Sequence, residues 1–197
     1  MIRRMAEAAI RIPKERRPRD ATRAASRSAI LDAARRVAAR DGARELSLRG
    51  VAAEAGFAPA ALYGYFRNKD ELLLALAADD LTALARVMRD AGGLSGAGLA
   101  ALDLLKGAET MAAASGALNH GQGGDAERLF NGRLIVALKA LSQASGLPTG
   151  SRESQCDVVL VAAALAGLAL FSRSGRLAAL GFTPEEMVAR VESRFRA

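Results

Sequence analysis

The side chains best suited to binding chemistry lie between residues 47 and 71, and their types favour an anionic partner. Ser47 precedes a helical pattern, so its hydroxyl and the free backbone amides that follow can meet a phosphate. Lys69 opens a second helical pattern and carries a positive charge. Tyr63 and Tyr65 each combine an apolar ring with a polar tip, which suits contact with phosphate or sugar when the ring is exposed. This segment therefore predicts a surface that binds phosphate groups.

Catalytic chemistry finds little support in the same sequence. The chain has one histidine, His120, and one cysteine, Cys156, which together cannot build a typical zinc site. No clustered nucleophile and base, metal-ligand spacing or phosphate loop is present. We expect His120 in a surface loop within the glycine-rich stretch 119–124, and Cys156 as a small core residue beside an apolar run. The sequence predicts no enzyme, no metal and no cofactor.

Composition predicts an all-α protein with a basic N-terminal third. Apolar residues make up 51% of the chain, aromatic residues only 4%, and Ala and Leu dominate. Residues 1–70 hold 16 Lys and Arg against 8 Asp and Glu, whereas residues 71–197 hold 12 against 13. Nearly all of the net charge of +7 therefore lies in the first third. Such a distribution is typical of nucleic-acid binding, although a solvated basic tail would give it too.

The elements that position the anion-binding side chains are four consecutive helical patterns. They are expected at about 27–41, 48–55, 59–65 and 68–90. Gly56 suits a sharp turn between the second and third, and Ala52 is small where those two helices must cross. Phe57 can fill the turn, while Leu62 and Phe66 are four apart and pack inward. Two short helices around such a turn predict a helix-turn-helix.

Residues 26–75 resemble the DNA-binding domain of the TetR family of transcriptional regulators. The resemblance rests on the helix at 27–41, the stretches Leu48-Arg49-Gly50-Val51-Ala52 and Ala55-Gly56, and the run from Leu62 to Leu72 with its Tyr63-Gly64-Tyr65-Phe66 segment. It implies a sequence-specific DNA-binding regulator with a recognition helix in the major groove. The family often has Ser or Thr where this chain has Ala58, so a helix cap worth about 1 kcal/mol is missing.

Chemistry and resemblance together give a set of expected DNA contacts. These are Ser47, Arg49, Pro59, Ala60, Ala61, Tyr63, Gly64, Tyr65 and Lys69. The small segment 59–61 can approach thymine methyls but offers no bidentate hydrogen bonds. Alternatively, Tyr63 is a half-buried packing residue and Lys69 is an ordinary surface charge.

We divide the chain into a flexible basic arm at 1–25, a helix-turn-helix domain at 26–72 and a helical ligand-binding and dimerisation domain at 73–197. Pro13 and Pro18 are expected to interrupt helix in the arm, which can add salt-dependent affinity through the minor groove. Met5 is an alternative start that would shorten the arm.

The C-terminal part predicts helices at about 97–115, 125–145, 152–173 and 184–195. The apolar run from Val158 to Phe171 is shorter than the roughly 20 residues that cross a bilayer, so we expect a buried helix and a cytoplasmic protein. The resemblance implies effector binding and dimerisation here. Our candidates are a homodimer interface formed by 152–173 and 184–195 and an apolar pocket for a hydrophobic effector. Expected pocket residues are Met111, His120, Phe130 and Leu134.

The leading interpretation is thus a ligand-responsive repressor that binds a palindromic operator as a homodimer. Effector binding would favour a dimer with wrongly spaced recognition helices, and affinity for the operator would fall. A second interpretation is a helical protein-interaction module with a vestigial helix-turn-helix, toward which the missing cap at Ala58 points. An enzyme with a helical active site is the third.

Overall fold

The computed structural model describes residues 18–106, 109–119, 124–147 and 150–195, and within these ranges it consists of helices joined by turns, without a strand. This confirms the all-α prediction. The helices are α1 (Pro18–Asp41), α2 (Leu48–Ala55), α3 (Pro59–Leu62), α4 (Lys69–Asp90), α5 (Gly93–Lys106), α6 (Glu109–Asn119), α7 (Gly124–Ser145), α8 (Arg152–Arg173), α9 (Arg176–Ala179) and α10 (Pro184–Phe195).

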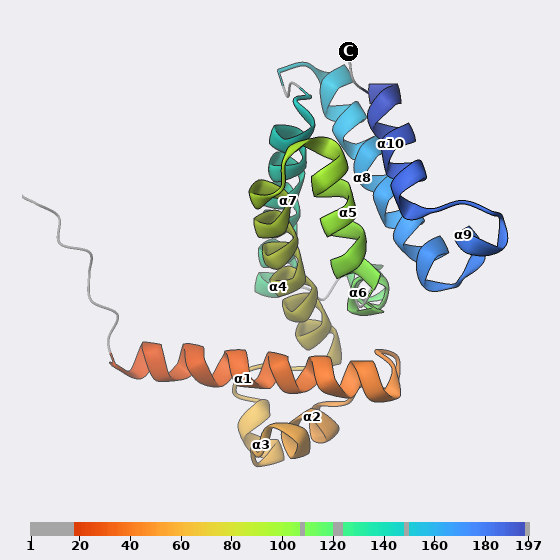
Figure 1. Cartoon of the computed structure of the whole chain (residues 1–197). Coiled ribbons are helices and arrows are strands. Elements are labelled where there is room, and N and C mark those ends of the chain that lie inside the picture. Colours follow the sequence, from red (N-terminus) through yellow and green to blue (C-terminus); the bar gives the residue numbers. More distant parts are fainter. Residues whose placement is uncertain (1–17, 107–108, 120–123, 148–149, 196–197) are drawn as a thin grey trace, which may run out of the picture.

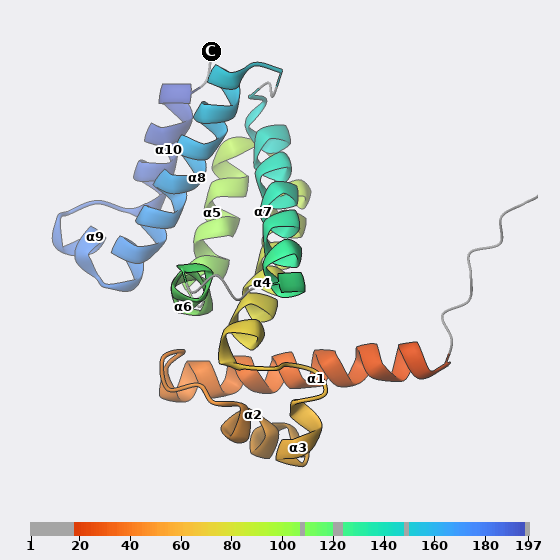
Figure 2. The ribbon, with the colours of Figure 1, turned by 180° about the vertical axis from the view of Figure 1, so that it is seen from behind.

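Helix α1 lies across one end of the molecule and separates two groups of helices (Figure 1). The short α2 and α3 lie on one side of it, and the bundle of α4 to α10 lies on the other. Helix α4 runs from α1 up into the bundle, as the view from behind also shows (Figure 2). The arrangement holds α2 and α3 at the free end of the molecule.

Two hydrophobic cores meet on α4. Leu72 and Leu76 pack into a small core with α1, α2 and α3, whereas Leu74 and Leu81 pack into the larger core of the bundle. Their spacing places the two pairs on different faces of the same helix. Because α4 is continuous from Lys69 to Asp90, the boundary predicted at residues 72–73 falls inside it, and the small core extends to Leu76.

Local capping signals define several helix ends as expected. Ser47 accepts a hydrogen bond from the Gly50 amide at 3.1 Å, and Gly56 ends α2 with a φ of 72°. At α10, the Glu186 amide donates to Thr183 Oγ1 at 3.2 Å and the Thr183 amide donates to the Glu186 carboxylate at 2.8 Å. This reciprocal pair is a capping box, and it explains why α10 begins where the sequence predicts.

The structure differs from the prediction at several points. Helix α1 begins at Pro18, so residues 18–25 are helical and are not part of a flexible arm. Pro18 occupies the first helical position, where a missing amide hydrogen costs nothing. The helix predicted at 97–115 is two helices, α5 and α6, and the sequence between them contains Gly107, a poor helix former. Helix α9 was not predicted. The rest of the predicted arm, residues 1–17, lies outside the described ranges.

Helix α8 is less buried than its composition predicted. Val158 and Leu165 face the core, but Leu160 and Leu170 on the opposite side are 56% and 53% exposed. Only 22% of its most apolar stretch is buried within the chain, so the expectation of a buried helix is wrong for a single chain. By length and composition α8 could also cross a membrane, a test that core helices of soluble proteins pass as well. Cys156 is exposed on α8 and is not a core residue.

Candidate nucleic-acid interface

Helices α2 and α3 are fixed to each other by the small core. Val51 and Ala52 on α2, Leu62 on α3 and Phe66 after it are each at most 1% exposed. The predicted inward packing of Leu62 and Phe66 is therefore confirmed. With these side chains buried, the opposite faces of both helices are left to the solvent.

A hollow of about 420 Å³ lies where the start of α2, the end of α3 and the start of α4 meet. Its lining includes four of the expected site residues, which come from three separate segments of the chain: Ser47, Arg49, Tyr63 and Lys69. Arg67 and Asn68 line it as well. Arg67 was not predicted as a site residue, although a second cation two residues before Lys69 could have indicated it. The charged side chains in this lining are all cationic, so the hollow suits a phosphate group.

Two of these cations already have partners. The Lys69 amine donates to the backbone carbonyl of Arg44. Arg67 donates from Nε to the Glu71 carboxylate at 3.1 Å, and its backbone amide donates to the same oxygen at 2.8 Å. Both side chains are thereby held at the edge of the hollow.

The outward face of α3 is small and exposed. Pro59, Ala60 and Ala61 are exposed, as is Gly64 beyond the end of the helix, and Tyr63 is 53% exposed. This exposure is compatible both with a DNA contact and with the alternative that Tyr63 is a half-buried packing residue. Ala58 makes no side-chain hydrogen bond at the start of α3, as its sequence implies, and Pro59 stands at the first helical position.

Tyr65 lies between two other side chains and is only partly exposed. Its ring meets Phe57 edge to face, with centroids 6.4 Å apart, and the guanidinium of Arg23 lies 5.3 Å from its centroid. Arg23 also donates from Nη2 to the carbonyl of Gly64 at 3.0 Å. Arg23 on α1 therefore holds the turn after α3 in place. No local sequence pattern indicates this contact, because Arg23 and Gly64 are 41 positions apart.

Ion pairs attach α2 to α1 on the other side. Glu54 accepts from Arg36 Nε at 2.7 Å and from Arg40 Nη1 at 3.1 Å. Hydrogen bonds from Arg36 and then Arg40 hold the pKa of the Glu54 carboxyl below its ordinary value. A hydrogen bond from Arg40 likewise lowers the pKa of Asp41. The helix that precedes the turn is thus fixed by both apolar and charged contacts.

Comparison with known proteins agrees with this geometry. Residues 30–76 match the family model described as bacterial regulatory proteins, tetR family. That range contains the turn, the small core and the whole of the hollow. Over residues 30–76 the chain is therefore similar to the TetR family of bacterial regulatory proteins.

Solved structures share the fold over most of the chain. A TetR transcriptional regulator from Rhodococcus sp. RHA1 is 19% identical, with a TM-score of 0.66 over 89% of this chain and 98% of that one. A second transcriptional regulator from the same source is 24% identical, with a TM-score of 0.59 over 86% and 94%. A TetR-family regulator from Streptomyces coelicolor is 20% identical, with a TM-score of 0.56 over 87% and 95%. No curated protein matches the chain.

The match places residues 30–76 with the N-terminal domain of these bacterial regulatory proteins. Beyond these residues, the bundle encloses a cavity of about 130 Å³ among α4, α5, α6, α7 and α8. Met111 and Leu134, two of the expected pocket residues, line it. Phe130 is 6% exposed within the core and is not in this lining. His120 lies outside the described residues.

Proposed function

We propose that this protein is a TetR-family transcriptional regulator, a repressor that binds a palindromic operator as a homodimer and is released by a small hydrophobic effector. The observation that carries the proposal is the cationic hollow beside the exposed face of α3. A groove-facing helix next to a phosphate site is what recognition of duplex DNA requires.

The residues of this surface divide into two roles. Ser47, Arg49, Tyr63 and Lys69 bind phosphates around the hollow, which fixes the register of the protein on DNA. The residues that face the bases are Pro59, Ala60 and Ala61, with Gly64 beyond them, and they read shape and thymine methyls. Tyr65 contributes its hydroxyl from a ring held by Phe57 and Arg23. The phosphate contacts therefore supply most of the affinity for DNA, and α3 supplies a modest discrimination between bases.

The homodimer forms through α8 and α10. Leu160, Ala163 and Leu170 share the face of α8 that is turned away from the core, and each is exposed. An exposed apolar stripe of this length marks an interaction surface, and the small Ala163 allows a second helix to approach closely. Two-fold symmetry would place two α3 helices about 34 Å apart, one turn of DNA.

The effector site is the apolar cavity within the bundle, lined in part by Met111, Leu134 and Leu138. The helix-turn-helix domain at 26–72, the ligand-binding domain at 73–197 and a cytoplasmic location complete the proposal. The described part of the basic arm, residues 18–25, continues α1, and the remaining arm would add salt-dependent affinity for DNA.

The deciding experiment compares binding of the purified protein to the DNA upstream of its own gene with binding to scrambled DNA of equal composition. It is run at several salt concentrations. The proposal predicts a preference of at least about a thousandfold for the upstream DNA and a steep fall with salt. Equal, weak binding to that DNA and to a genomic library would contradict a sequence-specific repressor. It would favour the alternative that the chain is a protein-interaction module.

A charge reversal separates the hollow from general electrostatics. Lys69→Glu is expected to abolish specific binding, because it places a carboxylate beside the phosphate site. Arg86→Glu, on the exposed face of α4 and outside the hollow, makes the same change in net charge and serves as the matched control. Circular dichroism verifies that both variants remain helical. Equal losses in the two variants would contradict the assignment of Lys69.

The interface is tested by mass in solution. Leu170→Glu on α8 is expected to convert the homodimer to monomer, because it buries a charge in an apolar interface. Leu129→Glu on α7, also an exposed leucine, is the control and is expected to leave the dimer intact. A wild-type monomer at micromolar concentration would overturn the dimer through α8.

A further inference from the structure

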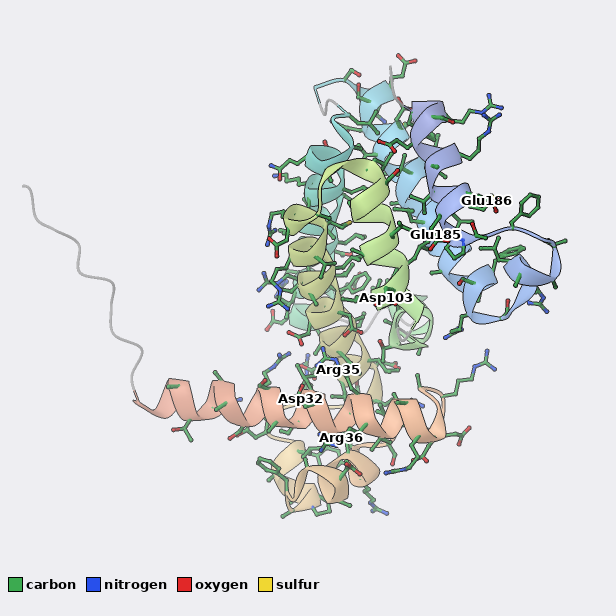
Figure 3. All side chains as sticks on the ribbon, viewed as in Figure 1. Asp32, Arg35, Arg36, Asp103, Glu185 and Glu186 are labelled. Atoms are coloured by element: carbon green, nitrogen blue, oxygen red, sulfur yellow. The ribbon has the colours of Figure 1, made fainter. Side chains whose placement is uncertain are left out.

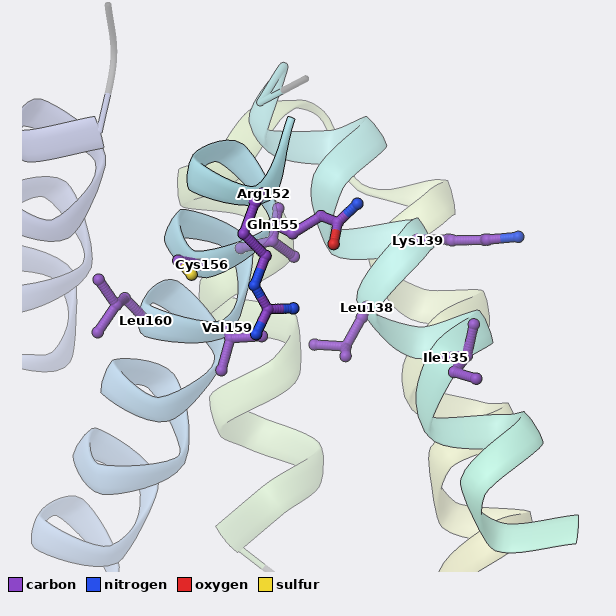
Figure 4. A pocket seen from close by; sticks show the side chains of 9 residues that line it. Ile135, Leu138, Lys139, Arg152, Gln155, Cys156, Val159 and Leu160 are labelled. Carbon is purple, nitrogen blue, oxygen red and sulfur yellow. The ribbon is translucent and has the colours of Figure 1, made fainter. Parts of the chain in front are cut away.

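A surface groove of about 720 Å³ lies between α7 and α8. It takes no residue from the DNA-binding surface and shares Leu160 with the face of α8 proposed for the homodimer. Its floor is apolar, with Leu138 from α7 and Val158 and Val159 from α8. Figure 4 shows Leu138 and Val159 on the two helices that flank it. Arg152 and Gln155 on the first turn of α8 stand over the same gap.

The groove lies beside the cavity of about 130 Å³ inside the bundle. Leu138 lines both spaces and is therefore part of the wall that they share. On α8 the groove uses Val158 and Val159, and the cavity uses Ala162 and Leu165, one turn further along. Because side chains three and four apart share a face of a helix, both spaces lie along one side of α8.

The two spaces differ in polarity. The described residues that line the cavity are all apolar. The charged side chains that line the groove are Arg152 and Lys139, and no carboxylate is among its described lining residues. Figure 4 shows the Arg152 guanidinium running down beside Val159 toward the gap, whereas the Lys139 amine points away. Arg152 makes no ion pair within the described ranges of the chain.

We propose that groove and cavity together bind a small organic acid with an apolar tail. The carboxylate pairs with the Arg152 guanidinium in the groove, and the tail passes Leu138 and ends in the cavity. A planar guanidinium suits a carboxylate because it can donate two parallel hydrogen bonds. A dry apolar cavity of about 150 Å³ holds a benzene molecule, so the end of the tail is a phenyl ring or a short alkyl segment.

This inference deepens the proposed function, since it names the chemical class of the effector. Binding of the acid does not depend on DNA, however, and is measured on the DNA-free protein. Octanoate is the probe, and octylammonium has the same tail with the opposite charge. Saturable binding of octanoate by calorimetry, at least about tenfold tighter than octylammonium, is expected.

Variants test each end of the ligand separately. Arg152→Gln is expected to weaken octanoate about tenfold and to leave octylammonium no weaker, whereas Arg133→Gln, at an exposed position of α7 outside the groove, changes neither. Ala162→Leu fills part of the cavity and is expected to weaken octanoate and hexanoate, with thermal unfolding verifying the fold. Across hexanoate, heptanoate and octanoate, each added methylene is expected to raise affinity about fourfold.

Several outcomes would overturn the site. The site is contradicted if the protein shows no saturable binding of octanoate. It is also contradicted if Arg152→Gln keeps the preference for octanoate over octylammonium, or if a folded Ala162→Leu binds octanoate as tightly as the wild type. Failure of operator binding would instead overturn the proposed function and leave the titration untouched. If octanoate binds but does not release the operator, the site stands and its role as the effector site fails.

Discussion

Arg35 on α1 and Asp80 on α4 form a joint between the DNA-binding helices and the bundle. The Arg35 guanidinium donates to the same Asp80 oxygen from Nε at 3.2 Å and from Nη2 at 3.0 Å. The other Asp80 oxygen accepts from Thr110 Oγ1 on α6 at 2.6 Å. Figure 3 places Arg35 where α4 passes α1. One carboxylate thus connects α1, α4 and α6, and α6 contributes Met111 to the cavity.

Removing Arg35 is predicted to destabilise the protein more than removing a nearby surface arginine. Asp80 is 14% exposed, so Arg35→Gln leaves a largely buried carboxylate with Thr110 as its remaining partner, at a cost of about 1–3 kcal/mol. Arg36→Gln breaks an exposed pair with Glu54 and is expected to cost about 1 kcal/mol or less. Urea unfolding of both variants measures the difference, and equal losses would contradict the joint.

The same joint predicts non-additive effects. Arg35→Gln and Thr110→Val both remove hydrogen bonds from Asp80, so the double variant is expected to differ from the sum of the singles by about 0.5–3 kcal/mol. Arg36→Gln combined with Thr110→Val shares no partner and is expected to be additive within about 0.5 kcal/mol. Additivity in both pairs would show that Asp80 does not couple α1 to α6.

Arg23 is predicted to act on DNA binding through the turn after α3. Arg23→Gln loses the bond to Gly64 and the contact with Tyr65, so operator affinity is expected to fall about fivefold, with little change in its dependence on salt. Arg49→Gln removes a cation from the hollow and is expected to lower the salt slope by about 1. Binding isotherms at four salt concentrations separate the two. A drop in slope for Arg23→Gln would make it a phosphate contact instead.

Local signals explain which parts of the fold the sequence could predict. Ser47 and Gly56 cap α2, and Thr183 begins α10, each through neighbours within a few residues. The start of α1 was missed because Arg23 contacts Gly64, a residue distant in sequence. A polar, arginine-rich segment with prolines gives no periodicity that would reveal such a contact.

The candidate site was likewise predictable where local sequence signals exist, and unpredictable where it depends on contacts between distant residues. The hollow was predictable because Ser47 and Lys69 begin helices and lie within one motif. Cys156 was misplaced because both faces of α8 are apolar, and apolar periodicity cannot distinguish a face that packs on the core from one exposed in a single chain. The groove beside Arg152 needs the packing of α7 against α8, which no sequence pattern contained.

Acid is predicted to loosen the attachment of α2 to α1. Hydrogen bonds from Arg36 and Arg40 depress the pKa of Glu54 in the folded state, so their contribution is fully present above the ordinary value of 4.5. It is lost as the pH falls through the lower folded value. Glu54→Gln lacks this titration. The difference in Tm between wild type and Glu54→Gln is therefore expected to shrink as the pH falls from about 5 to about 3. A constant difference over that range would contradict the assignment.

Gly98 is predicted to be required for the approach of α10 to α5. A Cβ at this position would lie 2.8 Å from Val188 Cγ1 and 3.2 Å from Leu165 Cδ2, and Val188 is 1% exposed. Val188 is β-branched and enclosed, so it has little freedom to move away. Gly98→Ala is expected to lose about 1–2 kcal/mol of stability, even though alanine favours the helix by up to about 1 kcal/mol. Gly132→Ala on α7 meets nothing within 4 Å and is expected to gain about 0.5–1 kcal/mol. Urea unfolding is expected to show changes of opposite sign in the free energy of unfolding of the two variants. A gain of stability in both would mean that the contact between α5 and α10 has space for a Cβ at Gly98.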